Sequence, residues 1–313
     1  MPPLLWRGSA MRDRVGARAQ VSAPATSANL GPGFDSFGLC LGLRDEVSAA
    51  VTSRSLLVEI TGEGADSLPR DESHLVVRAM RATFTMLEVA QPCLLLRCHN
   101  TIPHGRGLGS SAAAIVSGIR LAETVAERDL NADRRLDLAT QLEGHPDNVA
   151  ACLLGGFTIA WTEGRRSRAL RLDVHADVQA TIFVPAATLS TARARDLLPV
   201  AVAHGDAAAN VARAGLLTAA LTQRPDLLHA ATKDWLHQDH RRSAMPETLA
   251  LLDAMREAGI AAVVSGAGPS LLALGTKQHP VDAATWSRPG WRSSRTDIEA
   301  LGATSEALPP RAE

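Results

Sequence analysis

The sequence predicts an α+β protein made of two lobes. Strand patterns precede helix patterns in both halves of the chain, without the steady strand–helix alternation that builds a doubly wound sheet. The length, 313 residues, suits about two domains. We therefore expect a disordered tail over residues 1–18, where the sequence is basic and aperiodic, a first lobe over residues 19–165 and a second lobe over residues 166–313.

In the first half, alternating and β-branched residues predict strands, and apolar residues at helical spacing predict helices. The expected strands occupy residues 19–23, 47–60 and 94–100, with a turn-rich loop at 24–35. The expected helices run from an N-cap at Ser73 to about residue 89, from the end of a glycine-rich stretch at 103–111 to about residue 126, and from residue 132 to 142.

In the second half, strand patterns return directly after Gly155-Gly156 and then give way to helices. These strands are expected at residues 157–162, 170–174 and 179–184, and helix patterns dominate residues 191–258. Two more strands within residues 261–274 are joined by the turn Gly266-Ala267-Gly268. The sequence after residue 280 has no strong pattern.

The composition argues against nucleic-acid binding and against a membrane span. The formal net charge is −1 and aromatic residues make up 3% of the chain, so a basic or stacking surface has little to be built from. No apolar run approaches the roughly 20 residues that cross a bilayer. The four cysteines form no CxxC pair and have no spacing typical of zinc ligands. We expect a cytoplasmic protein.

The strongest motif is a glycine-rich loop that leads into a helix. It reads Pro103-His104-Gly105-Arg106-Gly107-Leu108-Gly109-Ser110-Ser111-Ala112-Ala113. Glycines at alternate positions let the backbone turn tightly and approach a ligand closely. The first N–H groups of the following helix have no helical partner and carry partial positive charge, so they suit a phosphate group. The sequence therefore predicts a phosphate-binding loop.

Three better-known phosphate loops do not match this motif. A Walker loop needs Gly-Lys-Ser/Thr, but the only lysines of the chain are Lys233 and Lys277. A protein kinase needs a strand lysine and a His-Arg-Asp motif, and neither lysine lies in a suitable setting. A dinucleotide fingerprint follows the first strand of the fold, whereas this loop comes after residue 100.

The loop resembles that of the GHMP kinases, the superfamily that includes galactokinase, homoserine kinase, mevalonate kinase and phosphomevalonate kinase. Their loop reads Pro-x-Gly-x-Gly-Leu-Gly-Ser-Ser-Ala, which Pro103–Ala112 matches throughout. Pro24–Asp35 resembles the N-terminal motif of the superfamily, and Ser265–Ser270 resembles its C-terminal glycine turn. The resemblance implies a two-lobed GHMP kinase fold, with an N-terminal ribosomal-protein-S5-like lobe that binds ATP and a C-terminal α/β sandwich lobe.

Within the superfamily, the details are similar to those of the homoserine kinases. Pro24–Asp35 matches their motif Pro-Ala-Thr-Ser-Ala-Asn-Leu-Gly-x-Gly-Phe-Asp at every fixed position, and Glu143–Ala150 resembles their segment before a Gly-Gly-Phe strand. Ser190–Pro199 and Leu236–Arg241 resemble two further segments, Ser-Thr-x-x-Ala-Arg-x-x-Leu-Pro and Leu-His-Gln-x-x-Arg. The likeness spans roughly residues 19 to 275, and the end of the chain departs from the family pattern.

The resemblance implies roles for the residues that face ATP. The loop Pro103–Ala113 is expected to bind the nucleotide, with its amides and Ser110 on the phosphates. Ser111 and Glu143 are expected to ligate Mg²⁺, which favours oxygen ligands and retains water. Together with Asp147 and Asn148 they form the expected catalytic set. Asp147 stands where mevalonate-type kinases place a catalytic aspartate, but direct attack without a dedicated base is the usual expectation for homoserine kinases, so both alternatives stay open.

The resemblance also implies how an amino acid with a free hydroxyl is held. Arg195 and Arg241 are the candidates for its carboxylate, because a guanidinium pairs with a carboxylate through two hydrogen bonds. Asp35 with Asn29 is expected to bind its ammonium group, and Asn148 to orient its hydroxyl.

The function implied is ATP-dependent phosphorylation of the side-chain hydroxyl of L-homoserine, a step of threonine biosynthesis. One alternative is a GHMP-type kinase for another small alcohol. The other is a ligand sensor of the same fold without catalysis, which would predict a damaged phosphate loop or missing metal ligands. The expected ligands are ATP, Mg²⁺ and the small-molecule substrate, with no nucleic acid and no membrane, and a homodimer is a further possibility.

Overall fold

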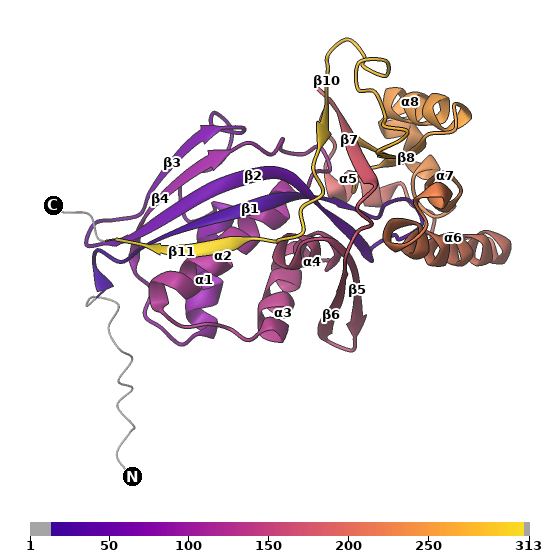
Figure 1. Cartoon of the computed structure of the whole chain (residues 1–313). Helices are drawn as coiled ribbons and strands as arrows, with labels where there is room; N and C mark the ends of the chain where they lie inside the picture. Colours follow the sequence, from indigo (N-terminus) through magenta and orange to yellow (C-terminus); the bar gives the residue numbers. More distant parts are fainter. Residues whose placement is uncertain (1–13, 310–313) are drawn as a thin grey trace.

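The computed structural model describes residues 14–309, which form two lobes around two β-sheets (Figure 1). The first sheet has seven strands in the order β11-β1-β2-β4-β3, and β5 pairs with β2 and with β6. These strands are β1 (Arg18–Ala28), β2 (Phe37–Thr52), β3 (Leu57–Gly62), β4 (Cys93–Asn100), β5 (Phe157–Glu163), β6 (Arg166–Leu172) and β11 (Thr304–Leu308). All pairs are antiparallel except β3 with β4.

Four helices cover one face of the first sheet (Figure 1). They are α1 (Leu75–Met86), α2 (Ser110–Ala126), α3 (Ala132–Glu143) and α4 (Asp147–Leu154). The central helix, α2, buries twelve of its 17 residues, most of them small or aliphatic. An alanine-rich helix of this kind lets the sheet and its neighbours approach closely, so the first turn of α2 is held in a fixed position against β1.

The second lobe has a four-stranded antiparallel sheet in the order β10-β7-β9-β8. Its strands are β7 (Val178–Pro185), β8 (Ala261–Val264), β9 (Leu271–Thr276) and β10 (Trp291–Thr296). Its helices are α5 (Thr191–Asp196), α6 (His204–Thr222), α7 (Leu228–Ala231) and α8 (Pro246–Glu257), with short 3₁₀ turns at Pro225–Leu227 and Asp239–Ala244. The main buried cluster of the first lobe continues into this lobe through Leu217, Val263 and Leu272, so the two lobes share a core.

The predicted α+β class and two-lobed architecture are confirmed, but two predicted boundaries are wrong. The tail was expected to be disordered through Arg18, yet the amide of Gly16 donates to the carbonyl of Val51 at 2.9 Å, and the amide of Val51 donates to Ala17 at 2.9 Å. These bonds extend the ladder between β1 and β2 and fix residues 14–18. The rest of the expected tail, residues 1–13, lies outside the described residues.

The expected seam at residue 165 lies inside a hairpin rather than between the lobes. Strands β5 and β6 pair from Phe157–Leu172 to Glu163–Arg166, so residue 165 is at their turn. After β10 the chain returns to the first lobe, where β11 pairs with β1 (Figure 1). Residues 166–172 and 304–308 therefore belong to the first sheet, although they were assigned to the second lobe.

Smaller differences concern the ends of elements. The helix expected to begin at Ser73 begins at Leu75 with His74 at its N-cap, because the Ser73 hydroxyl donates instead to Asp71 at 2.5 Å. Strand β1 continues through Pro24 into the predicted loop, since a register shift between Pro24 and Ala25 accommodates the proline. Strands β10 and β11 formed where the sequence showed no pattern.

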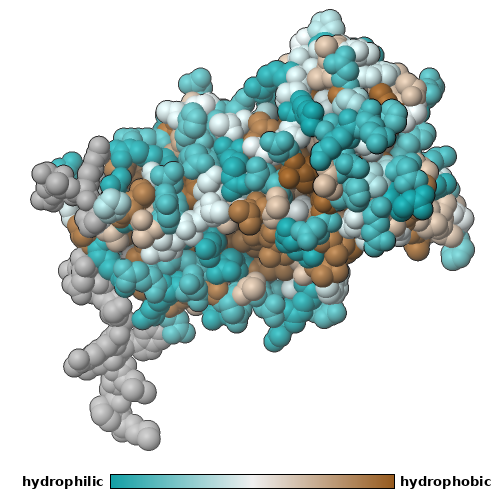
Figure 2. Space-filling model, in the orientation of Figure 1, coloured by the Kyte–Doolittle hydropathy of each residue, from teal (hydrophilic) through white to brown (hydrophobic). Residues whose placement is uncertain are grey.

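The hydrophilic side chains are spread over most of the visible face, and the apolar ones gather near its middle, between the lobes (Figure 2). Among residues 14–309, every helix is too short or too polar to cross a membrane.

Candidate active site

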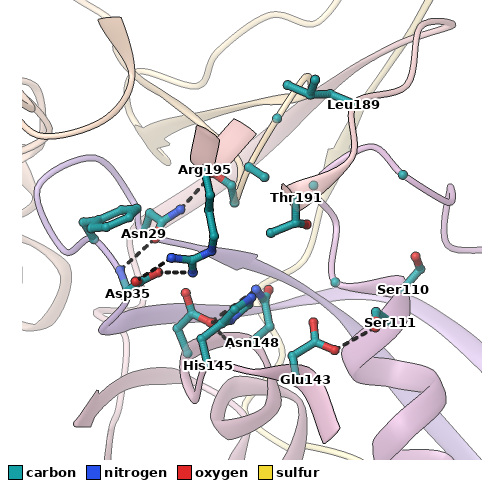
Figure 3. Close-up of a pocket in the computed structure, with 18 of the residues that line it drawn as sticks. Asn29, Asp35, Ser110, Ser111, Glu143, His145, Asn148, Leu189, Thr191 and Arg195 are labelled. Carbon is teal, nitrogen blue, oxygen red and sulfur yellow. Dashed lines mark hydrogen bonds and ion pairs between the residues drawn. The ribbon is translucent and has the colours of Figure 1, made fainter. Parts of the chain in front are cut away.

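A cavity of about 110 Å³ lies where the two lobes meet, and the predicted motifs line it together (Figure 3). The first lobe contributes the 29–35 loop, the glycine loop and the start of α4, and the second lobe contributes α5, Arg241 and the 266–268 turn. Its polar walls are formed by Asn29, Asp35, Ser110, Ser111, Glu143, His145, Asp147, Asn148, Thr191, Arg195 and Arg241. Segments far apart in the sequence therefore form one site.

The glycine loop needs glycine for its backbone angles and for its contacts. Gly105, Gly107 and Gly109 have φ of 65°, 74° and 72°, a region that residues with a Cβ rarely adopt. A Cβ on Gly107 would lie 2.1 Å from the carbonyl oxygen of Ser265, and one on Gly109 would lie 1.9 Å from the Thr26 hydroxyl. The loop is thus packed against both lobes at once.

Helix α2 begins at Ser110 with Gly109 as its N-cap, and no side chain caps it. The amides of its first turn point toward the cavity end of the helix without helical partners, where the helix dipole adds positive charge. Ser110 and Ser111 line the cavity at this end (Figure 3). The predicted phosphate loop therefore has the geometry of an anion site.

Not every residue of the predicted loop can touch a ligand through its side chain. Leu108, Ala112 and Ala113 are buried in the core. The guanidinium of Arg106 donates to the carbonyls of His104, Pro185 and Ala186 at 2.8–3.0 Å, so it anchors the loop to the end of β7 instead of facing the cavity. These residues shape the loop, and the glycines and serines form the surface that a ligand would meet.

Ser111, at the start of α2, and Glu143, at the end of α3, lie side by side in the cavity wall (Figure 3). The Ser111 hydroxyl donates to Glu143 Oε2 at 2.6 Å. Burial raises the pKa of the Glu143 carboxyl, and the hydrogen bond from Ser111 offsets only part of this. Two oxygen ligands side by side, one of them a carboxylate that is poorly solvated, fit a hard cation such as Mg²⁺. Neither residue is part of a cluster of three or more acidic, histidine or cysteine ligands within residues 14–309, so bound phosphate and water would have to complete the coordination of a cation.

Asp147 and Asn148 begin α4 and are both buried. Asp147 Oδ1 accepts hydrogen bonds from the Asn148 amide at 2.7 Å and from His145 Nδ1 at 2.6 Å. Burial lowers the pKa of His145, but the Asp147 carboxylate outweighs this and the pKa is raised. Asn148 Oδ1 accepts from the Thr26 hydroxyl at 2.7 Å. These contacts fix the orientation of both side chains.

Asn29 and Asp35 lie on a loop with unusual backbone angles. Asn29, Leu30 and Asp35 have φ of 68°, 50° and 55°, a left-handed region that asparagine and aspartate tolerate better than leucine and that is common in functional loops. The Asn29 side chain is used within the protein, because Nδ2 donates to the Gly266 carbonyl at 2.8 Å and Oδ1 accepts the Asp35 amide at 2.9 Å. Asn29 therefore positions Asp35 and ties the loop to the second lobe.

The two arginines differ in their surroundings. Arg195 forms a two-pronged ion pair with Asp35, at 2.6 and 2.9 Å (Figure 3). Arg241 is 2% exposed, and within residues 14–309 its hydrogen bonds go to neutral groups: the carbonyls of Ala194 and Gly266 at 3.2 Å and His237 Nδ1 at 3.0 Å. Burial and the nearby Arg195 charge lower its pKa to about 10, so it stays cationic at neutral pH.

Sequence reasoning gave no role to Phe34 and His237, which support the arginines. The Phe34 ring lies 5.7 Å from the Arg195 guanidinium, 5.8 Å from that of Arg241 and 5.1 Å from the His237 ring. His237 Nε2 is 2.8 Å from the carbonyl of Gly31, which can only accept, so its Nδ1 carries no proton and accepts from Arg241. The signal was present: Phe34 precedes Asp35 directly, and His237 lies four residues before Arg241.

A second cavity of about 200 Å³ adjoins the glycine loop and shares Ser110 and Ser111 with the first. His104 lines this cavity and not the first one. Two buried polar atoms in its wall, His74 Nδ1 and Ser117 Oγ, have no hydrogen-bond partner within residues 14–309. It thus offers an apolar pocket with unused hydrogen-bonding groups beside the phosphate loop.

The fold and the site define a kinase of the GHMP type, and comparisons with known proteins agree. Residues 74–156 match the family model described as GHMP kinases N terminal domain, and residues 216–285 match GHMP kinases C terminal. The chain is 50% identical to the homoserine kinase of Streptomyces avermitilis over 92% of this chain and 95% of that one. It is 54% identical to the homoserine kinase of Clavibacter michiganensis subsp. michiganensis over 84% of each. The chain belongs to the homoserine kinase family.

Solved structures place the fold in the same group. The crystal structure of homoserine kinase from Cytophaga hutchinsonii superposes with a TM-score of 0.80 and 27% identity, covering 97% of this chain and all of that one (100%). A crystal structure of mevalonate kinase, with a TM-score of 0.65 and 12% identity over 90% of this chain and 99% of that one, is similar in fold alone. The predicted GHMP kinase fold and the resemblance to homoserine kinases are confirmed.

Proposed function

We propose that this protein transfers the γ-phosphoryl group of ATP to the side-chain hydroxyl of L-homoserine and forms O-phospho-L-homoserine. The observation that carries the proposal is Arg241, a buried cation without a carboxylate partner among the described residues, in the wall of the cavity that the glycine loop also lines. A buried charge of this kind favours an anionic ligand, and an amino-acid substrate supplies its carboxylate there.

At the other end of the cavity, the glycine loop and the first turn of α2 would hold the β- and γ-phosphates of ATP. The second cavity would take the nucleoside, since it adjoins Ser110 and Ser111 and its apolar wall carries the two unused polar atoms of His74 and Ser117. Phosphoryl transfer depends mainly on positioning and on neutralising charge, which is what this arrangement provides.

Ser111 and Glu143 would hold Mg²⁺, as the sequence predicted. Their oxygens lie 2.6 Å apart and both line the cavity next to the phosphate loop, so they fit a cation that keeps phosphate and water as its other ligands. When bound, the cation neutralises charge on the phosphates. The protein itself contributes the fixed positions of these two oxygens and of the loop amides.

At the substrate end, Arg241 and Arg195 would bind the carboxylate, Asp35 the ammonium group and Asn148 the hydroxyl. We assign Asp147 a positioning role, because its Oδ1 already accepts hydrogen bonds from His145 and from the Asn148 amide and is therefore occupied within the protein. Attack of the hydroxyl on the γ-phosphorus without a dedicated base is therefore the mechanism we propose.

The test is ATP turnover with Mg²⁺ and a panel of L-homoserine, L-serine, L-threonine, mevalonate and galactose. Stimulation by homoserine alone is expected. Stimulation by another alcohol would support the alternative kinase, and ATP binding without turnover on any alcohol would support the sensor, although the intact loop and the facing Ser111 and Glu143 argue against it.

Substitution of Arg241 tests whether the activity depends on this buried cation. Arg241→Met should raise the KM for homoserine by about 10- to 150-fold, the value of a charged hydrogen bond of about 1.5–3 kcal/mol, and leave the KM for ATP unchanged. Arg213→Met is the matched control, since Arg213 lies in the same lobe over Trp235 and does not line the cavity.

A homodimer, a cytoplasmic location and the lack of nucleic-acid binding stay predictions. Size-exclusion chromatography with light scattering tests whether the protein is a homodimer.

A further inference from the structure

The ion pair between Asp35 and Arg195 occupies the part of the cavity where the substrate is expected to bind. Arg195 Nη1 donates to Asp35 Oδ2 at 2.9 Å and Nη2 donates to Oδ1 at 2.6 Å. The pair joins the 29–35 loop of the first lobe to α5 of the second, and Figure 3 shows the Arg195 side chain reaching across to Asp35. Both side chains line the cavity and both are 37% exposed, so a ligand can reach them.

The other charged groups of the cavity are already committed. Glu143 accepts from Ser111, and Asp147 accepts from His145. Arg241 is held by two backbone carbonyls and by His237, and these contacts fix the direction of its guanidinium group. Asp35 and Arg195 are the more exposed pair of opposite charges in the cavity wall, at 37% each, because His145 and Asp147, which also pair with each other, are only 15% and 2% exposed.

We propose that the Asp35–Arg195 ion pair stands in for the substrate in the empty site and opens when an amino acid binds, so that it selects ligands that carry both an ammonium and a carboxylate group. The inference rests on the proposed function. The ammonium group would replace Arg195 on Asp35, and the carboxylate would replace Asp35 on Arg195 beside Arg241. Each charge that the opening releases then finds a new partner.

A ligand with one charged group cannot complete this exchange. A carboxylate without an ammonium group either leaves Asp35 unpaired when it takes Arg195, or leaves the ion pair closed and binds to Arg241 alone. Leaving a charge unpaired in a partly buried site is costly. Selectivity for amino acids thus has two sources. One is the attraction between the charged groups of the ligand and the cavity, and the other is the competition between Asp35 and the ligand carboxylate for the Arg195 guanidinium.

The competition predicts an unusual result for the Asp35→Asn variant. Asparagine tolerates the positive φ of 55° at this position, so the loop should keep its shape. Loss of the carboxylate should weaken binding of L-homoserine by tenfold or more. The same change should strengthen binding of 4-hydroxybutanoate, which lacks only the ammonium group, by about tenfold, because Arg195 is no longer occupied.

The experiment is a double-mutant cycle for 4-hydroxybutanoate, measured by calorimetry in the wild type, Asp35→Asn, Arg195→Gln and the double variant. Removing a negative charge would by itself attract an anion, so Arg195→Gln is the control. If Arg195 is the released partner, Asp35→Asn should raise the affinity for 4-hydroxybutanoate about tenfold when Arg195 is present. The same substitution should raise it less than twofold when Arg195 is replaced by glutamine. Equal gains in both backgrounds, or no gain in either, would overturn the inference.

Two measurements on the same proteins separate this inference from the proposed function. Thermal unfolding and ATP binding of each variant report whether it is folded. Turnover of homoserine by the wild type tests the kinase assignment, and its absence would overturn the proposed function. Turnover together with equal gains in the cycle would overturn the ion-pair exchange alone.

Discussion

Substitution of Gly107 by alanine tests whether the glycine loop depends on contact between the lobes or only on backbone angles. Gly105 and Gly107 have φ of 65° and 74°, so alanine is strained at both by about 1–2 kcal/mol. Their contacts differ. A Cβ on Gly105 would meet Thr188 at 3.5 Å, an ordinary distance, whereas one on Gly107 would lie 2.1 Å from the Ser265 carbonyl oxygen.

The contact sets the size of the expected effect. A methyl group added at Gly107 would lie 2.1 Å from the Ser265 carbonyl oxygen, about 0.9 Å closer than the 3.0 Å below which real Cβ atoms are not found. The nearest atoms belong to the backbone of Ser265 and Gly268, so they cannot rotate away. The loop and the 266–268 turn must therefore separate by about 1 Å. A misplacement of that size costs roughly 100-fold in rate when it moves reacting groups. Gly107→Ala should lose about that factor in kcat/KM for ATP.

The assay compares three variants by chemical unfolding and by kcat/KM for ATP at saturating homoserine. Gly259→Ala measures strain alone, because Gly259 has a φ of 82°, no atom within 4 Å of the added Cβ and no place in the cavity wall. Gly105→Ala should resemble it in stability and keep kcat/KM within about tenfold. If Gly107→Ala matches Gly105→Ala in both measurements, contact between loop and turn does not explain the glycine.

Three further predictions concern the groups around the cavity. Glu143→Ala should lower turnover by orders of magnitude without unfolding the protein, and near-normal turnover would show that Glu143 is no metal ligand. The control is Glu257→Ala, because Glu257 does not line the cavity; turnover and unfolding by calorimetry are measured for both variants. Asp147→Asn should lower kcat by less than about tenfold in the same turnover assay, and a loss of 10²- to 10⁴-fold, typical of general-base removal, would identify a base. Burial lowers the pKa of His237 to about 4, below its usual 6.5. Between pH 6.5 and pH 4 the unfolded chain therefore binds a proton at His237 that the folded protein does not bind. The free energy of unfolding should fall as the pH falls through this window, by at most about 1.4 kcal/mol per pH unit. His237→Gln should reduce the pH dependence of urea unfolding in that window, and an unchanged pH dependence would mean that His237 does not titrate there.

Local signals predicted the parts of the fold that depend on neighbours in the sequence. Helix α2 begins at the serines after the glycine loop, continues through the alanine-rich run and ends at Ala126, as the pattern indicated. The strand β11 could not be predicted in this way, because its residues pair with Arg18–Ser22 at the other end of the chain. Its exposed, polar sequence has no alternation of its own, since it is an edge strand whose place is set by the partner.

The site was predicted from motifs as a set of residues, and its internal contacts were not. The sequence predicted both Asp35 and Arg195 as substrate ligands, but not that they bind each other across 160 positions. It treated Arg195 and Arg241 as equivalent, although one is paired with a carboxylate and the other is buried among neutral acceptors. Such differences depend on burial and on partners from distant segments, which a single sequence does not reveal.

The three motifs are best understood as one structure, because they hold each other as much as they would hold a ligand. The Ser265 hydroxyl donates to the Gly107 carbonyl at 2.6 Å, the Thr26 amide donates to the carbonyl of Leu108 at 3.1 Å, and Asn29 donates to Gly266. Each of these bonds joins a different pair of motifs. A residue such as Ser265, which is fully buried, is needed because it fixes the loop that we propose holds the phosphates. Substituting it should therefore disturb ATP binding as strongly as substituting a residue that touches the nucleotide.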